Sequence, residues 1–184
     1  MLVSVIMPLY NVENYVHEAI NSFLQQTMTD FEIICVDDGS TDSTPQIIEA
    51  YAAEDSRIKL IRQKNLGAGA ARNNGMKYAT GKYIYFFDGD DYCKPDLLER
   101  LVIKANRTGA DIVVLDYYRI DDCTKKEQLY KGLDSKFLPQ DKETFCYTDV
   151  PNNILSIINP TPWNKFYNRE FVLSTSLSFM ELST

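Results

Sequence analysis

The feature that most constrains the fold is a regular alternation of short apolar, β-branched runs with segments of helical periodicity. Each run is apolar at successive positions, which is typical of strands that are buried on both faces of a parallel sheet. The expected strands are residues 3–7, 31–36, 58–61, 83–87 and 112–115. This alternation predicts an α/β fold with an open, mostly parallel sheet and right-handed connections.

The segments between these runs have the periodicity and the end signals of helices. Apolar residues recur three and four positions apart after the first strand, which forms one helix face directed at the sheet. Ser43 and Gln46 can form a capping box at the start of the second helix. The expected helices are residues 16–24, a helix from Ser43 onward, 70–79, a helix from about Pro95 to Gly109, and two weaker ones at 153–158 and 168–173.

The pattern becomes less regular after about Asp121, where charged residues, Gln and Tyr are mixed through a long segment. No internal repeat or Gly/Ser linker separates this part from the rest. We therefore expect an α/β core over residues 1–120 and a smaller C-terminal region, 121–184, packed on it.

Composition argues against several classes of function. The chain has 26 acidic and 19 basic residues, a net charge of -7, which does not suit a surface that follows nucleic-acid phosphates. A diphosphate substrate would need local positive charge, most simply a metal ion. The absence of an 18-residue apolar stretch and of a signal peptide predicts a cytosolic protein, and the four widely spaced cysteines are expected to be free thiols.

Three of the expected strands end in polar residues, and ligands bind beyond the carboxyl ends of strands in open α/β sheets. The first strand leads into residues 8–11, the second into residues 37–42 and the fourth into residues 88–91. Each segment alone could be a turn, a helix cap or a solvated loop. Repulsion among Asp88, Asp90 and Asp91, however, would be relieved by a divalent cation that also binds substrate phosphates.

Four motifs in order make a more specific case. They are Val-Ser-Val-Ile-Met-Pro-Leu-Tyr-Asn, Val-Asp-Asp-Gly-Ser-Thr-Asp, Gly-Ala-Gly-Ala-Ala-Arg-Asn and Phe-Asp-Gly-Asp-Asp, and they fall within the first hundred residues. This order resembles the pattern of family 2 glycosyltransferases. A shorter segment, residues 162–171, is similar to the acceptor-side segment of that family.

The resemblance implies a GT-A fold and an inverting transfer of a sugar from a nucleoside diphosphate, most simply uridine diphosphate, to an acceptor hydroxyl. It implies that Asp90, with Asp88, binds Mn²⁺ or Mg²⁺ as a DxD motif and that Asp38 accepts a hydrogen bond from the uracil N–H. The residues that it places around the donor are Pro8, Leu9, Tyr10, Asn11, Glu13, Asp38, Arg72, Asn73, Asp88, Gly89 and Asp90.

On the acceptor side the resemblance implies Asp91, Trp163, Asn164 and Lys165, although Trp163 could equally be a core residue. The acceptor would be a saccharide or a lipid-linked saccharide in bacterial surface polysaccharide assembly, which is compatible with peripheral association at the inner face of the membrane. The general base, the Asp of a Glu-Asp pair in the family, is expected beyond Thr184. Glu181 is the first candidate within the chain.

Two other functions stay open at this point. Residues 83–90 read as an apolar strand followed by Asp-Gly-Asp, an arrangement also found in phosphohydrolases of the haloacid dehalogenase type. The motif there belongs to an early strand and continues differently from Asp91-Tyr92. The chain could also be a nucleotide-sugar-binding module without catalytic activity.

Overall fold

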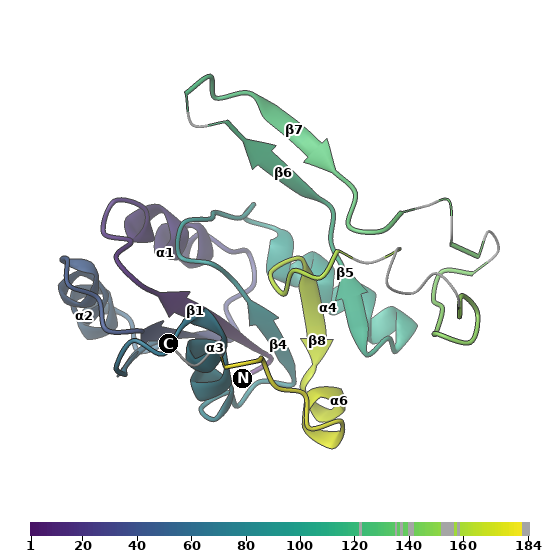
Figure 1. The fold of residues 1–184 in the computed structure, drawn as a ribbon, viewed down its shortest axis with the longest axis horizontal. Helices are drawn as coiled ribbons and strands as arrows, with labels where there is room; N and C mark the ends of the chain where they lie inside the picture. The colour runs from purple at the N-terminus through teal and green to yellow at the C-terminus, as the bar shows by residue number, and fades with distance from the viewer. Residues whose placement is uncertain are drawn as a thin grey trace.

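The computed structural model describes residues 1–121, 123–134, 136, 138–139, 142–151, 157 and 159–181. Its centre is a six-stranded sheet with the order β3-β2-β1-β4-β8-β5 (Figure 1). The strands are β1 (Val3–Leu9), β2 (Phe31–Asp37), β3 (Ile58–Arg62), β4 (Tyr83–Phe86), β5 (Ile112–Val114) and β8 (Lys165–Asn168). The first four pair in parallel, so the expected mostly parallel sheet is confirmed.

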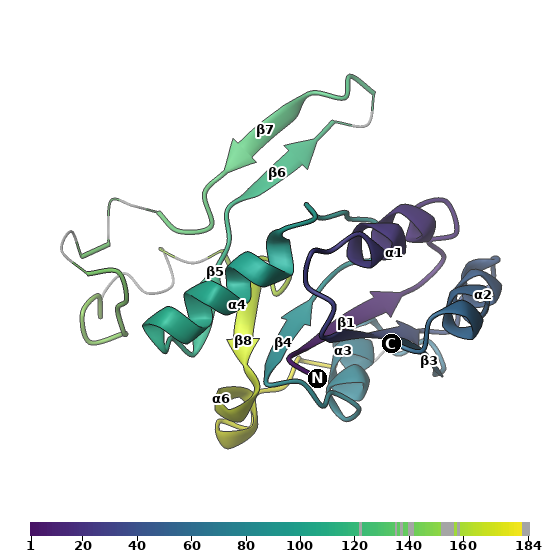
Figure 2. The same cartoon turned by 180° about the vertical axis from the view of Figure 1, so that it is seen from behind.

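Helices cover both faces of this sheet, as Figures 1 and 2 show from opposite sides. One face packs against α1 (Val16–Leu24), α2 (Thr44–Glu54) and α4 (Leu97–Thr108), and the other packs against α3 (Ala68–Met76) and α6 (Arg169–Ser174). The helix expected at 153–158 lies, except for residue 157, outside the described residues.

Buried aromatic side chains dominate the packing between α1 and the sheet. Phe23 of α1 is fully buried and meets Phe87 edge-to-face, with 4.7 Å between the ring centroids. Full burial of a side chain of this size stabilises a fold by about 1.5–3 kcal/mol relative to exposure. Because Phe87 directly precedes Asp88, this contact anchors the start of the acidic segment in the core.

Strand β8 comes from the C-terminal part of the chain but lies inside the sheet. It pairs antiparallel with β4 on one side and with β5 on the other. Phe166 is buried and stacks on Tyr83, with 4.9 Å between their centroids. Sequence patterning missed this strand because it is only four residues long and lacks a β-branched residue.

A second element that the sequence pattern missed is a hairpin of β6 (Tyr117–Ile120) and β7 (Glu127–Tyr130), which projects away from the sheet in Figures 1 and 2. Most of its residues are exposed, so no apolar face marks it in the sequence. The boundary expected between residues 120 and 121 falls within this hairpin.

At the amino end of the strands, a buried carboxylate is fully paired. Glu32 of β2 accepts hydrogen bonds from the hydroxyls of Ser4 and Thr80 and from the ammonium of Lys59, each at 2.7 Å. Burial alone would raise the pKa of Glu32, but these bonds outweigh burial and lower its pKa to about 2. The charged form of Glu32 is therefore part of the folded structure at neutral pH.

Two smaller observations complete the fold. All four cysteines are free thiols, as expected, and burial raises the pKa of Cys35 to about 12. No helix within the described part of the chain is both long enough and apolar enough to cross a membrane.

Candidate functional site

The loops that follow β1 and β2 are joined by hydrogen bonds between side chains and backbone. Asn11 has a positive φ of 52°, a conformation that asparagine tolerates better than most residues. Its backbone N–H donates to the Ser40 hydroxyl at 3.0 Å, and its Oδ1 accepts from the backbone N–H of Thr41 at 2.8 Å. Asn11 therefore lies beyond the carboxyl ends of β1 and β2, at the rim of the candidate site, where it fixes one loop against the other.

Two carboxylates continue this connection at the start of α2. Glu13 accepts from the backbone N–H of Ser43 at 2.8 Å, and Asp42 accepts from the backbone N–H groups of Glu13 and Thr44. The capping box expected from Ser43 and Gln46 is wrong, because the Ser43 side chain makes no capping bond. The carboxylates satisfy N–H groups at this helix end instead.

Asp38 is buried beyond the end of β2 and shapes the loop that leads into α3. Its Oδ1 accepts from Gln63 Nε2 at 2.7 Å and from the Leu66 N–H at 2.9 Å, and its Oδ2 accepts from the Gly67 N–H at 2.8 Å. A carboxylate has about four lone-pair sites, so one acceptor site is left beside these three bonds.

The apolar part of the rim divides into an exposed and a buried portion. Tyr10 is 48% exposed and offers its ring to solvent, whereas Leu9 is 1% exposed and belongs to the core. A Cβ on Gly89 would lie 2.2 Å from Leu9 Cδ2, so Leu9 fills the space that Gly89 leaves. The expectation that Leu9 lines a ligand directly does not fit this burial, and Pro8 is partly exposed beside it.

Arg72 and Asp88 form an ion pair between α3 and the end of β4. Arg72 donates to Asp88 Oδ1 at 2.7 Å, and the two side chains are 13% and 29% exposed. The Nε of Arg72 is buried and has no hydrogen-bond partner among the described residues. The guanidinium thus retains an unused donor beside Asp88, as an anion-binding group would.

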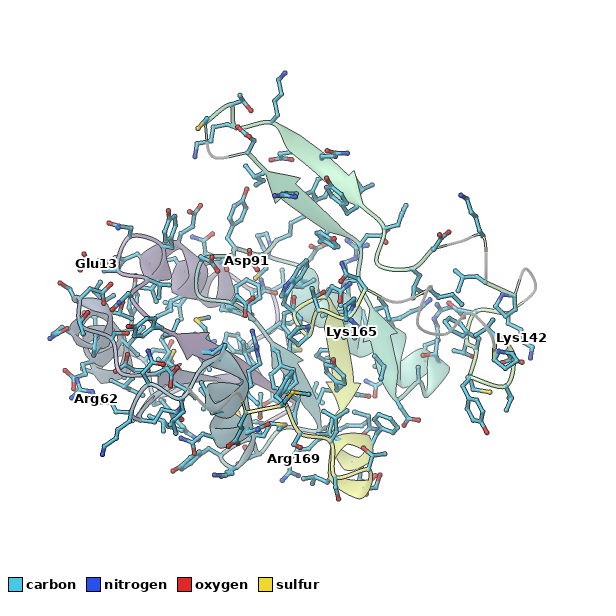
Figure 3. The ribbon with its side chains drawn as sticks, in the orientation of Figure 1. Glu13, Arg62, Asp91, Lys142, Lys165 and Arg169 are labelled. Carbon is cyan, nitrogen blue, oxygen red and sulfur yellow. The ribbon has the colours of Figure 1, made fainter. Side chains whose placement is uncertain are left out.

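The other acidic residues of this segment are not paired. Asp90 is exposed, and its carboxylate has no hydrogen-bond partner in the described part of the chain. Asp91 is exposed when the whole residue is considered, but protein atoms surround its carboxyl group. This local burial, together with the charges of Asp88 and Asp90, raises the pKa of Asp91 to about 6. Figure 3 shows Asp91 in the region between α1 and the β6–β7 hairpin.

These carboxylates fit a divalent cation only if substrate oxygens share it. Within the described residues, no group of three or more His, Cys, Asp or Glu side chains is arranged to hold a metal ion. Mg²⁺ and similar ions are commonly held by one or two carboxylates together with substrate phosphates. Asp90, which has no partner among the described residues, and the repulsion between the carboxylates of Asp90 and Asp91 are what a site that shares a cation with substrate phosphates would show.

Asn73, which its motif placed near the donor, is held by a segment from the other end of the chain. Its amide bonds to Phe179 and Glu181, in the segment that follows α6. Sequence patterning could not reveal this contact, because it joins positions more than a hundred residues apart. Patterning also missed Gln63, which binds Asp38 without belonging to a motif.

On the expected acceptor side, Trp163 is half-buried and packs on the hairpin. Its ring meets Tyr117 edge-to-face at 4.6 Å, and Tyr117 stacks on Tyr130 at 5.4 Å. Trp163 thus connects the hairpin to β8, which begins two residues later, and stays partly accessible.

Asn164 and Lys165 are buried, which argues against direct contact with an acceptor. The Lys165 ammonium donates to the carbonyl oxygens of Asn159 and Thr161, each at 2.5 Å, and to Asn164 Oδ1 at 2.8 Å. Burial lowers the pKa of Lys165 to about 8. As Figure 3 shows, Lys165 lies at the start of β8, so these residues organise the turn before the strand.

Comparisons with known proteins agree with this architecture. The putative glycosyltransferase EpsH of Bacillus subtilis is 35% identical over 181 residues, which cover 96% of this chain and 50% of EpsH. TarS of S. aureus in complex with UDP-GlcNAc is 29% identical with a TM-score of 0.75, over 98% of this chain and 49% of that chain. The chain therefore spans about half the length of each.

A more distant structure contains a metal ion. The mannosyltransferase PcManGT from Pyrobaculum calidifontis, in complex with GDP-Man and Mn²⁺, is 25% identical with a TM-score of 0.58, over 61% of this chain and 34% of that one. Together with TarS it identifies the fold as GT-A. Residues 4–172 match the family described as "Glycosyl transferase family 2", and the chain belongs to that family.

Proposed function

We propose that this chain binds the donor of an inverting, metal-dependent glycosyltransferase that transfers a sugar from a uridine diphosphate sugar to a saccharide or lipid-linked saccharide in bacterial surface polysaccharide synthesis. The observation that carries the proposal is the acidic segment Asp88–Asp91 after β4, where Asp90 has no partner in the part of the chain that the structure describes and lies beside the Asp88–Arg72 pair. It occurs in a fold that matches TarS with UDP-GlcNAc over 98% of the chain.

The nucleoside would lie between the loops after β1 and β2. The exposed ring of Tyr10 offers a stacking surface for the base, and the remaining acceptor site of Asp38 suits the uracil N–H. Pro8 and Leu9 support this pocket from the core, while Asn11 and Glu13 hold its two loops together.

The diphosphate would lie toward Arg72, whose buried Nε provides a free donor for a phosphate or sugar oxygen. Asp90 and Asp88 would hold Mn²⁺ or Mg²⁺, which when bound offsets the negative charge of the departing diphosphate. In an inverting transfer the acceptor oxygen attacks the anomeric carbon as the bond to the diphosphate breaks, and a base takes the hydroxyl proton. We assign that base to none of the described residues.

Family membership leaves the haloacid dehalogenase interpretation without support. The Asp-Gly-Asp segment follows the fourth strand of a GT-A sheet, and Asp88 pairs with Arg72. A binding module without activity differs from the proposed function only in turnover, so the deciding experiment has to measure both binding and transfer.

The test combines calorimetry with product analysis. Uridine diphosphate should bind the protein tightly in Mn²⁺ and much more weakly in EDTA. Incubation with a panel of uridine diphosphate sugars and saccharide acceptors should give a glycoside whose anomeric configuration, measured by NMR, is opposite to that of the donor. Equal affinity in metal and chelator would rule out the metal-dependent site, and retained configuration would rule out the inverting mechanism.

A further inference from the structure

The segment after α6, residues 177–181, lies against α3 and is called the docked segment below. In Figures 1 and 2 the chain returns from α6 toward α3. Phe179 meets Phe86 of β4 edge-to-face at 4.9 Å, and the Arg72 guanidinium lies over the Phe179 ring, 5.4 Å from its centroid. Arg72 therefore forms an ion pair with Asp88 and a cation–π contact with the ring of Phe179.

The Asn73 amide holds the backbone of the docked segment on both sides of Phe179. Its Oδ1 accepts from the Phe179 N–H at 2.8 Å, and its Nδ2 donates to the Phe179 carbonyl at 2.9 Å. The same Nδ2 donates to Glu181 Oε1 at 3.0 Å. Because an amide nitrogen has two hydrogens, these bonds leave Asn73 no side-chain N–H for a donor substrate.

Gly69 supplies an independent sign that the docked segment has a fixed place. A Cβ on Gly69 would lie 2.5 Å from the carbonyl oxygen of Met180, closer than real Cβ atoms approach. Gly69 is helical and has no positive φ, so the backbone conformation does not require glycine there. The close approach of residue 180 does.

We infer that Asn73 is a positioning residue for sugar transfer: through the docked segment it holds Phe179 against Arg72 and Glu181 against α3. Phe179 in turn restricts the guanidinium that pairs with Asp88 at the donor site. Asn73 thus acts on the reaction without touching the donor. This inference rests on the proposed function, since it assigns a role within that reaction.

The first experiment compares Asn73→Ala with the wild type in the protein expressed from its complete gene. Hydrogen exchange at the Phe179 amide should accelerate at least about tenfold, because its acceptor is lost. The kcat for transfer should fall about 10- to 100-fold, as misplacement near a reaction site can cost that much. The dissociation constant of uridine diphosphate with Mn²⁺ should change much less than kcat, because Asn73 itself has no free side-chain N–H for the nucleotide and acts on it only through Phe179 and Arg72.

Asn106→Ala is the matched control. Asn106 also bridges two elements through its side chain, accepting from Lys82 and from the Tyr83 hydroxyl at 2.8 Å each, but on α4. It should lower stability to a comparable extent and leave both kcat and exchange at Phe179 unchanged. A kcat loss in Asn106→Ala as large as that in Asn73→Ala would mean that general destabilisation causes the effect, and the inference would fall.

Gly69→Ala tests the same role without altering Asn73. Alanine stabilises a helix relative to glycine, so a loss of transfer could not come from a weaker α3. We expect the added methyl group to displace Met180 and to act on the kinetics as Asn73→Ala does, with a lower kcat and a much smaller change in affinity for uridine diphosphate.

The outcomes separate this inference from the proposed function. Unchanged hydrogen exchange at Phe179 in Asn73→Ala would show that Asn73 does not hold the docked segment. Faster exchange with a normal kcat would show that holding the segment plays no role in transfer. An equal loss of nucleotide affinity and transfer would instead make Asn73 a donor-binding residue. A wild-type protein that neither binds uridine diphosphate nor transfers sugar would overturn the proposed function. The hydrogen-exchange data would still show whether Asn73 holds the docked segment.

Discussion

Two acidic segments follow buried parallel strands at the same edge of the sheet, and their carboxylates are in opposite situations. Residues 37–42, after β2, have carboxylates that accept hydrogen bonds from backbone N–H groups, as Asp38 does from Leu66 and Gly67. Residues 88–91, after β4, have one ion pair, at Asp88, an Asp90 without a partner among the described residues, and an Asp91 whose pKa is raised to about 6.

The difference teaches that acidic composition alone does not distinguish a structural loop from a binding loop. Carboxylates that satisfy the backbone stabilise the fold and are already occupied. Carboxylates that repel one another cost stability until a cation relieves them, which is the usual condition of a functional site. The predictions below test this division, from the largest expected effect to the smallest.

The strongest test exchanges aspartate for alanine in each segment. Asp90→Ala should abolish the metal dependence of uridine diphosphate binding and lower kcat for transfer about 10²- to 10³-fold, with stability changed by less than about 0.5 kcal/mol. Asp42→Ala, the matched control, should lower the melting temperature and keep the metal dependence. Calorimetry and thermal melts measure both; the reverse pattern would break the comparison.

Glu32 extends the comparison to the most completely paired carboxylate in the described structure. Its folded pKa of about 2 lies below the usual glutamate pKa of 4.5, so its contribution is fully present above pH 4.5 and is lost as the pH falls toward 2. The shift corresponds to a stability contribution on the order of 3 kcal/mol. Denaturant unfolding of wild type and Glu32→Gln from pH 2.5 to 7 should converge at the acid end; parallel curves would contradict the pairing.

Asp38 combines both situations and should show both effects. Asp38→Ala should weaken the binding of uridine diphosphate by roughly 1.5–3 kcal/mol, which is the contribution of a hydrogen bond to a charged acceptor. It should also speed hydrogen exchange at Leu66 and Gly67, whose N–H groups bond to Asp38. Normal affinity with faster exchange would show that Asp38 is structural only and that another residue binds the base.

The smallest effect is expected at Glu13. Glu13→Gln keeps an oxygen that can accept from the Ser43 N–H but removes a charge from the amino end of α2, which should cost about 0.3–1 kcal/mol. Uridine diphosphate affinity should hardly change. A large loss of nucleotide affinity, measured by calorimetry, would mean that Glu13 contacts the ligand directly.

Most of the sheet could be predicted from the sequence, because four buried parallel strands make long apolar runs that few other structures produce. The runs at 31–36 and 83–87 match β2 and β4 to within one residue at each end. Strand β8 and the β6–β7 hairpin could not be predicted. The four residues of β8 are stabilised by distant partners, such as Tyr83 for Phe166. The strands β6 and β7 pair with each other, but most of their residues are exposed, so no apolar pattern marks them.

Sequence motifs predict where candidate site residues lie along the chain, but not which groups those residues contact. Asp38 and Asp88 follow β2 and β4, and Arg72 lies inside α3, which begins at Ala68 and not at residue 70 as expected. Motifs do not reveal which polar side chains are already hydrogen-bonded within the protein, as Asn73 and the buried Lys165 are. Only the three-dimensional pairing separates such residues from those still free to bind.

The placement of β8 between β4 and β5 has a consequence during synthesis. When β4 leaves the ribosome, the edge that will receive β8 is still about 80 residues away from its partner. At about 5–20 residues per second, that backbone edge waits roughly 4 to 16 s without its hydrogen bonds. Unpaired strand edges are templates for association with other chains. The nascent chain is therefore most vulnerable to aggregation over that interval, when a chaperone that covers extended apolar segments would protect it best.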